Sequence, residues 1–200
     1  VLECIGEEFK PKKIFFAGTV ASYGFPYVKQ PIIEDDLFLG LPHGGEYGYA
    51  MAKRHAFNYL KIGKDLHDVE YVYGLLTNLF GEHDTFDSEN GHVIPSLISK
   101  AVNALENNRD TFEVWGNSES SRDFLYIKDA AKAIVYLMEN GSGIYNISTG
   151  RAKSMHELAT SISNSLSNKV VPVWNEKEPI GISERLVSNK KLTNLGFDDF

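Results

Sequence analysis

Tyr49 and Lys53 are a pair of residues whose types and spacing could support catalysis. Residues four positions apart lie on one face of a helix, so the phenol and the ammonium would be neighbours. A free phenol has a pKa of ~10, and a nearby ammonium favours the phenolate and lowers that pKa. Such a phenol could exchange a proton with a sugar hydroxyl or ketone while hydride moves to or from a nicotinamide. A half-buried tyrosine beside an exposed lysine fits the same spacing, so the pair alone does not identify an enzyme.

A threonine upstream of this pair favours the catalytic interpretation. The apolar residues 13–17 predict a buried strand that ends at Gly18 and Thr19. Ligands of open α/β sheets bind at the carboxyl ends of the strands, where the Thr19 hydroxyl could bond to the reacting oxygen. The alternative is that Thr19 only caps a turn. A strand, a hydroxyl, a long loop and a helix with Tyr-x-x-x-Lys together favour a redox site.

The elements that must position these residues alternate between predicted strands and helices. This order is typical of an α/β fold with a mostly parallel sheet. A long loop over 23–45 precedes a helix over 47–62, and a second polar loop covers 81–91. Further strands are predicted at 71–76, 112–115, 124–126, 143–147 and 170–174, and further helices at 95–106, 128–139 and 154–166. Ser154 and Glu157 have the spacing of a capping box.

Composition narrows the class of protein. The chain has 200 residues, of which 42% are hydrophobic and 24% are charged, as in ordinary globular domains. A net charge of −7 without a long basic run argues against nucleic acid as a partner. The chain lacks both the ~20 consecutive apolar residues of a membrane span and a secretory signal, so we expect a cytoplasmic protein without a membrane partner. Cys4 is the single cysteine, which excludes an internal disulfide and a cysteine-based zinc site, and we expect no metal.

The arrangement of Thr19, Tyr49 and Lys53 resembles the catalytic core of extended short-chain dehydrogenase/reductases, the NAD-dependent epimerase/dehydratase family. Downstream segments are most similar to the GDP-L-fucose synthase group of that family. These segments are 77–81, 83–86, 91–98, 114–116, 121–129 and 146–150, followed by Pro179, Gly181 and Arg185. The resemblance extends from about residue 13 to residue 200. It implies a Rossmann-like, mostly parallel sheet with a smaller C-terminal substrate-binding domain.

The resemblance also implies a domain division. Residues 1–81 would be the C-terminal part of a dinucleotide-binding domain, and residues 82–200 would mainly bind the nucleotide sugar. A segment near 124–147 would return to the Rossmann sheet. Neither G-x-x-G-x-x-G nor G-x-G-x-x-G occurs in the sequence. Because that loop holds the cofactor pyrophosphate at a helix N-terminus, we expect the N-terminal part of this domain to be missing from the sequence.

Roles for individual residues follow from the same resemblance. Thr19, Tyr49 and Lys53 would form the redox triad, and His92 would be the acid in epimerisation beside the ketone. The cofactor would be NADP, with NAD as the alternative, and would contact Thr19, Tyr49, Lys53, Leu76, Asn78 and Leu79. A GDP-sugar substrate would contact Asn78, His92, Val93, Lys100, Trp115, Arg122 and Arg185. In that set the basic residues would hold the pyrophosphate and Trp115 would line the guanine site, although each basic residue alone also fits an exposed charge.

One position departs from the family pattern and leaves the reaction partly open. Fucose synthases place a cysteine base two residues beyond the triad hydroxyl, and Ala21 stands there instead. Dehydratases place Asp-Glu after the hydroxyl, so Val20 and Ala21 also argue against dehydration. The sequence predicts NADP-dependent reduction of a GDP-4-keto-6-deoxy sugar, with 3,5-epimerisation undecided. The alternatives are a nucleotide-sugar 4-epimerase with tightly bound NAD and a non-catalytic nucleotide-sugar-binding homologue, and a homodimer is the family expectation.

Overall fold

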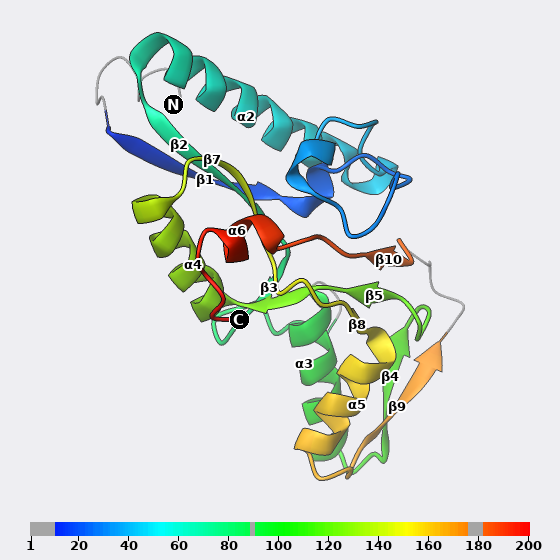
Figure 1. Cartoon of the computed structure of the whole chain (residues 1–200). Helices are drawn as coiled ribbons and strands as arrows, with labels where there is room; N and C mark the ends of the chain where they lie inside the picture. The colour runs from blue at the N-terminus through cyan, green and yellow to red at the C-terminus, as the bar shows by residue number, and fades with distance from the viewer. Residues whose placement is uncertain (1–10, 89–90, 176–181) are drawn as a thin grey trace. The chain divides into compact units, whose positions relative to one another are not determined.

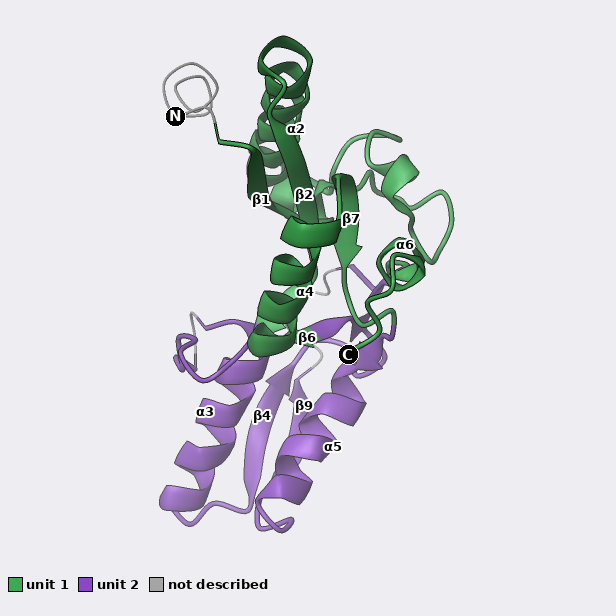
Figure 2. Cartoon of the chain, turned by 60° about the vertical axis from the view of Figure 1, so that its left-hand side comes forward, with its two compact units in different colours: residues 1–79, 125–150, 186–200 green, residues 80–124, 151–185 purple. Residues whose placement is uncertain are grey.

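The computed structural model describes residues 11–88, 91–175 and 182–200 of the chain (Figure 1). The chain divides into two compact units (Figure 2). The first unit contains residues 1–79, 125–150 and 186–200, and the second contains residues 80–124 and 151–185. Both units are therefore built from segments that are separated in the sequence.

A three-stranded parallel sheet forms the centre of the first unit. Its strands are β1 (Lys13–Thr19), β2 (Glu70–Leu76) and β7 (Gly143–Ile147), and β2 lies between the other two. The register pairs Thr19 with Leu76. Because the strands are parallel, their carboxyl ends share one edge of the sheet, where ligands bind in this fold class. The fold is α/β with a Rossmann-like parallel sheet, as the sequence predicted.

Two long helices cover opposite faces of this sheet. Helix α2 (Tyr47–His67) contributes Phe57 and Leu60 to a hydrophobic cluster that includes Tyr73. Helix α4 (Ile127–Asn140) contributes Leu137 and two alanines to a different cluster that includes Val72. Successive residues of a strand point to opposite faces, so these neighbouring β2 residues assign the two helices to the two faces. Burying a residue such as Leu137 completely contributes roughly 1.5–3 kcal/mol.

A buried polar network holds the long loop between β1 and α2. This connection contains three short 3₁₀ turns, η2 (Val20–Ser22), η3 (Glu34–Asp36) and η4 (Gly44–Glu46). The Tyr23 hydroxyl donates to Asn146 Oδ1 at 2.7 Å, and the Asn146 backbone N–H donates to Glu34 Oε1 at 2.9 Å. Burial raises the pKa of Tyr23 well above its usual range, so this hydroxyl stays a donor. The network ties the loop to the carboxyl end of β7.

The second unit has its own core. Strands β4 (Thr111–Trp115) and β9 (Val171–Asn175) pair in parallel, and α3 (Val93–Glu106) and α5 (Met155–Ser165) contribute Leu97, Ala101 and Ala159 to the same cluster as Phe112 and Val114. The predicted capping box is confirmed. Ser154 Oγ accepts from the Glu157 N–H at 3.1 Å, and Glu157 Oε2 accepts from the Ser154 N–H at 2.8 Å.

Short elements complete both units. A second sheet has the order β10 (Glu184–Arg185), β5 (Ser121–Arg122) and β8 (Lys153–Ser154). Strands β3 (Asn78–Phe80) and β6 (Phe124–Tyr126) form a pair, and α6 (Lys190–Asn194) brings Leu192 into the core of the first unit. Apart from β6, these elements were not predicted, because two to five residues carry no measurable periodicity. Within the described ranges, no helix combines the length and apolar character needed to cross a membrane.

Candidate functional site

Thr19 lies where β1 ends, at the carboxyl edge of the sheet. Its backbone is extended, and its side chain caps the η2 turn by accepting a hydrogen bond from the Ala21 N–H at 3.2 Å. Accepting one bond leaves a hydroxyl able to donate through its hydrogen. The cap therefore orients the hydroxyl without removing its ability to bond to a reacting oxygen.

Tyr49 and Lys53 lie on one face of α2. Tyr49 is 56% exposed, and the Lys53 ammonium lies 5.5 Å from the centroid of the Tyr49 ring. The same ammonium donates to the backbone oxygen of Ala17 at 2.8 Å and lies 5.1 Å from the Phe16 ring centroid. Lys53 thus connects the tyrosine to the last residues of β1. An ammonium has three donors, so the bond to Ala17 leaves capacity for a ligand.

The remaining residues expected to contact the cofactor lie at the carboxyl end of β2. Leu76 ends this strand as the register partner of Thr19, and Asn78 and Leu79 begin β3. All three are half-buried. Leu76 and Leu79 also pack against the cluster around Leu137, so part of each side chain has a core role.

His92 is paired with a carboxylate that the sequence analysis did not single out. Its Nδ1 lies 3.3 Å from Asp84 Oδ1, which also accepts from the Thr85 N–H at 2.8 Å. Gly91 makes this close return of the loop feasible, because a Cβ there would lie 2.6 Å from the Thr85 backbone oxygen. The His92 side chain is 82% exposed, so an oriented imidazole is accessible to a ligand. Val93, also 44% exposed, begins α3.

Lys100 and Trp115 contact each other in the second unit. The Lys100 ammonium lies 3.6 Å from the centroid of the Trp115 ring, a cation–π contact. Glu113 accepts from Trp115 Nε1 at 2.6 Å and from Asn175 Nδ2 at 2.7 Å, and these hydrogen bonds lower the pKa of its carboxyl. Trp115 is 44% exposed, so one side of the indole remains at the surface. Glu113 and Asn175 were not anticipated, although Glu113 lies two residues from Trp115 and hence on the same face of the strand.

Arg122 and Arg185 lie on paired strands and are register partners. The Arg122 guanidinium donates to the backbone oxygens of Ser121, at 2.7 Å, and of Ile182. Arg185 is 6% exposed. Arg122 therefore helps to hold β5 against the segment that leads into β10, a structural role that sequence spacing did not indicate.

The predicted residues fall into two groups, one in each unit. The first unit contains Thr19, Tyr49, Lys53, Leu76, Asn78 and Leu79, and the second contains His92, Val93, Lys100, Trp115, Arg122 and Arg185. Side-chain contacts join Tyr49 to Lys53 and Lys100 to Trp115. The three residues expected to carry out hydride transfer lie in the first unit, whereas His92 and most residues expected to bind the substrate lie in the second.

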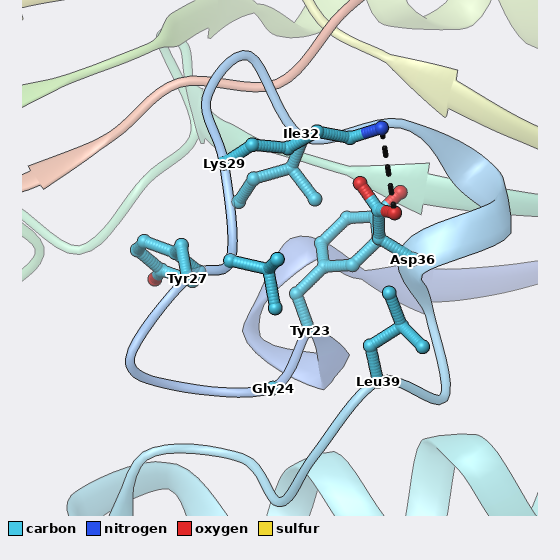
Figure 3. Close-up of a pocket in the computed structure, with 8 residues that line it drawn as sticks. Tyr23, Gly24, Tyr27, Lys29, Ile32, Asp36 and Leu39 are labelled. Carbon is cyan, nitrogen blue, oxygen red and sulfur yellow. Dashed lines mark ion pairs between the residues drawn. The ribbon is translucent and has the colours of Figure 1, made fainter.

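A shallow pocket opens in the loop between β1 and α2 (Figure 3). Its lining includes Tyr23, Tyr27, Ile32 and Leu39. Lys29 Nζ lies 4.0 Å from Asp36 Oδ1 on its wall, an ion pair between an exposed lysine and a largely buried carboxylate. None of the predicted catalytic or binding residues lines this pocket.

Comparisons with known proteins agree with this fold. A model of the NAD dependent epimerase/dehydratase family matches residues 1–148. A GDP-L-fucose synthase from Sinorhizobium fredii is 30% identical over 188 residues, which cover 93% of this chain and 60% of the relative. The crystal structure of a GDP-L-fucose synthetase from Naegleria fowleri bound to NADP has a TM-score of 0.88 at 27% identity, covering 98% of this chain and 63% of that one. A UDP-N-acetylglucosamine 4-epimerase from Methanobrevibacter ruminantium has a TM-score of 0.81 at 27% identity, with 98% and 61% covered. The chain spans less than two thirds of the length of each.

Proposed function

Because the chain belongs to the NAD-dependent epimerase/dehydratase family, we propose that it is the catalytic part of an NADP-dependent reductase of a GDP-linked 4-keto-6-deoxy sugar. One observation carries the proposal. The Lys53 ammonium lies 5.5 Å from the Tyr49 ring and is anchored to Ala17, two residues before the Thr19 hydroxyl. A phenol, an ammonium and a hydroxyl at the carboxyl edge of a parallel sheet are the groups that a carbonyl reduction needs.

In the proposed reaction, Tyr49 donates its proton to the C4 oxygen of the sugar as hydride arrives at C4. The carbonyl double bond becomes a C–O single bond, and the new hydroxyl retains the phenol proton. Lys53 stabilises the phenolate that remains, because a nearby cation favours the charged form. Thr19 donates a hydrogen bond to the same oxygen and orients it. General acid catalysis of this kind contributes typically 10²–10⁴-fold in rate.

The residues at the sheet edge fit a nicotinamide cofactor. Thr19 and Leu76 are register partners at the carboxyl ends of adjacent strands. The Lys53 ammonium bonds to the backbone oxygen of Ala17, close to the end of β1. Lys53 would bind the nicotinamide ribose, and Leu76, Asn78 and Leu79 would contact the ring. When bound, NADPH supplies the hydride. The relative from Naegleria fowleri that is bound to NADP supports NADP rather than NAD.

The position of Ala21 supports reduction without epimerisation at C3 and C5. Ala21 is 5% exposed in the turn that Thr19 caps, and a methyl group cannot carry a proton. His92, oriented by Asp84, is the remaining acid–base candidate for this step. In the second unit, Lys100, Arg122 and Arg185 would bind the diphosphate and Trp115 the guanine.

The decisive experiment uses the full-length protein, GDP-4-keto-6-deoxymannose and NADPH. Stoichiometric loss of NADPH absorbance, together with a product that NMR identifies as the C4-reduced sugar, would support the proposal. Tyr49→Phe should slow this loss by at least about 10²-fold while the Kd for NADPH changes little. If no 4-keto sugar causes NADPH oxidation, the proposal is wrong. Sugar nucleotide binding without turnover, unchanged in Tyr49→Phe, would point instead to a non-catalytic binding protein.

A nucleotide-sugar 4-epimerase is the second candidate, and the match to the Methanobrevibacter ruminantium epimerase favours it. That reaction would use the same Tyr49 and Lys53 but would return the hydride to the opposite face of C4. Tightly bound NAD would then be regenerated in every cycle. Conversion of a 4-hydroxy sugar nucleotide without net NADPH consumption would support this alternative.

A further inference from the structure

Arg54 is a buried cation that the proposed reaction does not use. It follows Lys53 in α2 and is 5% exposed, and burial lowers the pKa of its guanidinium. Among the residues with described positions, no carboxylate lies within ion-pair distance of it. A buried charge without a counter-charge is costly, so the hydrogen bonds that it makes must matter to the fold or to the site.

The guanidinium bonds to two backbone oxygens of the loop between β1 and α2. Arg54 Nε donates to Ser22 O at 2.7 Å, and Nη1 donates to Gly40 O at 2.9 Å. Its central carbon lies 5.5 Å from the centroid of the Phe38 ring. One side chain of α2 therefore joins the start of this loop to a residue in its second half.

Ser22 is the link to the catalytic groups, because it ends the turn that Thr19 caps. Its hydroxyl donates to the Ala50 backbone oxygen at 3.4 Å, and its own backbone oxygen accepts from Arg54. Ala50 and Arg54 directly follow the two catalytic candidates of the helix in sequence. The η2 turn, which Thr19 caps, is thus attached to α2 at two points that lie one helical turn apart.

Tyr73 of strand β2 also bonds to helix α2 close to the turn that Thr19 caps. Its hydroxyl donates to the Lys53 backbone oxygen at 3.0 Å and lies beside the Ser22 side chain. Its ring stacks on Phe16 and occupies the space beside Gly18, where a Cβ would lie 2.6 Å from the Tyr73 ring. Burial raises the pKa of Tyr73 to about 12, so the hydroxyl remains a donor at neutral pH. Strand, turn and helix therefore meet around one phenol.

We propose that Arg54 and Tyr73 are positioning residues that together set the distance between the Thr19 hydroxyl and the Tyr49–Lys53 pair. This inference rests on the proposed function. Both residues act through backbone oxygens of the segments that carry the catalytic groups. Because a displacement of about 1 Å can cost about 10²-fold in rate, loosening these bonds should slow the chemical step in protein that is still folded.

The first test compares two single-atom changes in the full-length protein, using single-turnover oxidation of NADPH by GDP-4-keto-6-deoxymannose. Tyr73→Phe removes the bridging hydroxyl. Tyr71→Phe is the matched control, because Tyr71 lies on the same strand and its ring also packs on Phe57, 6.0 Å between centroids. We expect Tyr73→Phe to slow oxidation about tenfold with the Kd for NADPH within about twofold, and Tyr71→Phe to leave both within about twofold. The isotope effect with 4-deuterated NADPH should rise in the slowed variant, which a simple loss of stability would not cause.

The second test asks whether Arg54 acts on the same distance. Arg54→Lys keeps the charge but lacks the two separate guanidinium nitrogens that bond to Ser22 O and Gly40 O, and it should also slow the chemical step. The double variant with Arg54→Lys and Tyr73→Phe should be slowed by less than the product of the two single slowdowns. Both changes alter the same distance, the one between the Thr19 hydroxyl and the Tyr49–Lys53 pair. Fully independent effects, or equal rates for Tyr73→Phe and Tyr71→Phe, would overturn the proposal. If the Arg54 variants do not fold, the tyrosine comparison decides alone.

Amide hydrogen exchange separates failure of this inference from failure of the proposed function. Absence of NADPH oxidation by the unmodified protein would refute the function. Exchange of residues 19–23 would then decide the inference. Faster exchange in both Tyr73→Phe and Arg54→Lys, but not in Tyr71→Phe, supports it, and unchanged exchange overturns it.

Discussion

Lys53 shows how much of a site follows from residue spacing. The four-residue interval predicts that its ammonium lies beside Tyr49, and the two groups are 5.5 Å apart by the ring centroid. The interval does not predict the bond from Lys53 to the Ala17 backbone oxygen, because that contact joins segments 36 residues apart. Spacing within one helix is readable from sequence, whereas the partner across the sheet depends on packing.

The buried phenol of Tyr73 leads to a prediction at alkaline pH. Its folded pKa is raised to about 12, above the ~10 of an unfolded tyrosine. The resulting stability is fully present below pH ~10 and is lost as the pH rises through about 12. We expect the free energy of unfolding to fall between about pH 10 and pH 12. Tyr73→Phe should make that fall shallower, as measured by urea unfolding at each pH, and an identical slope would contradict this account.

Ala21 leads to a prediction about the product. Reduction in D₂O should leave no deuterium at C3 and C5 of the sugar, because Ala21 stands where fucose synthases place a cysteine base and its methyl group cannot take a proton. NMR of the product measures this directly. Deuterium at either carbon would mean that His92, oriented by Asp84 at 3.3 Å, removes the proton, and Asp84→Asn should then reduce the incorporation.

The junction of β1 with β2 allows a paired test of packing. Gly18→Ala would place a Cβ 2.6 Å from a ring that is fully buried, whereas a Cβ at Gly63 in α2 meets nothing within 4 Å. Overpacking of this kind costs about 1–3 kcal/mol, so Gly18→Ala should lower the free energy of unfolding. Gly63→Ala should raise it by about 0.5–1 kcal/mol, because glycine is unfavourable inside a helix. Chemical denaturation measures both, and equal effects would contradict the packing described here.

The long elements were predictable because each carries a clear repeat. The helix predicted over 128–139 spans Ile127–Asn140, and the helix predicted to begin at Pro95 begins at Val93. Short strands such as β5 and β10 could not be predicted, since hydrogen bonds to distant segments define them. The same reason explains why the site was only partly foreseen: Tyr49 and Lys53 are neighbours in one helix, whereas contacts such as His92 with Asp84 depend on how a loop returns on itself.

In the proposed function, the groups for hydride transfer lie in the first unit and the groups that bind the diphosphate lie in the second. Substitutions can test this assignment. Tyr49 and Lys53 belong to the first unit, whereas Lys100 belongs to the second. Lys100→Met should therefore raise the KM for the sugar nucleotide about tenfold and leave the Kd for NADPH nearly unchanged, because loss of one charge-assisted bond removes about 1.5–3 kcal/mol. Lys169→Met, an exposed change in the second unit, is the control. An equal effect on both ligands would refute the assignment of Lys100 to the diphosphate.

The interleaved order of the first unit also constrains how the chain can fold during synthesis. Its central strand β2 is complete by residue 76, but β7 is made only after most of the second unit, and Leu192 and Phe197 of the same core come later still. During synthesis, the edge of β2 that pairs with β7 therefore stays unpaired while more than sixty residues are translated. An unpaired strand edge is prone to associate with other chains, so nascent-chain chaperones would have their main opportunity in that interval.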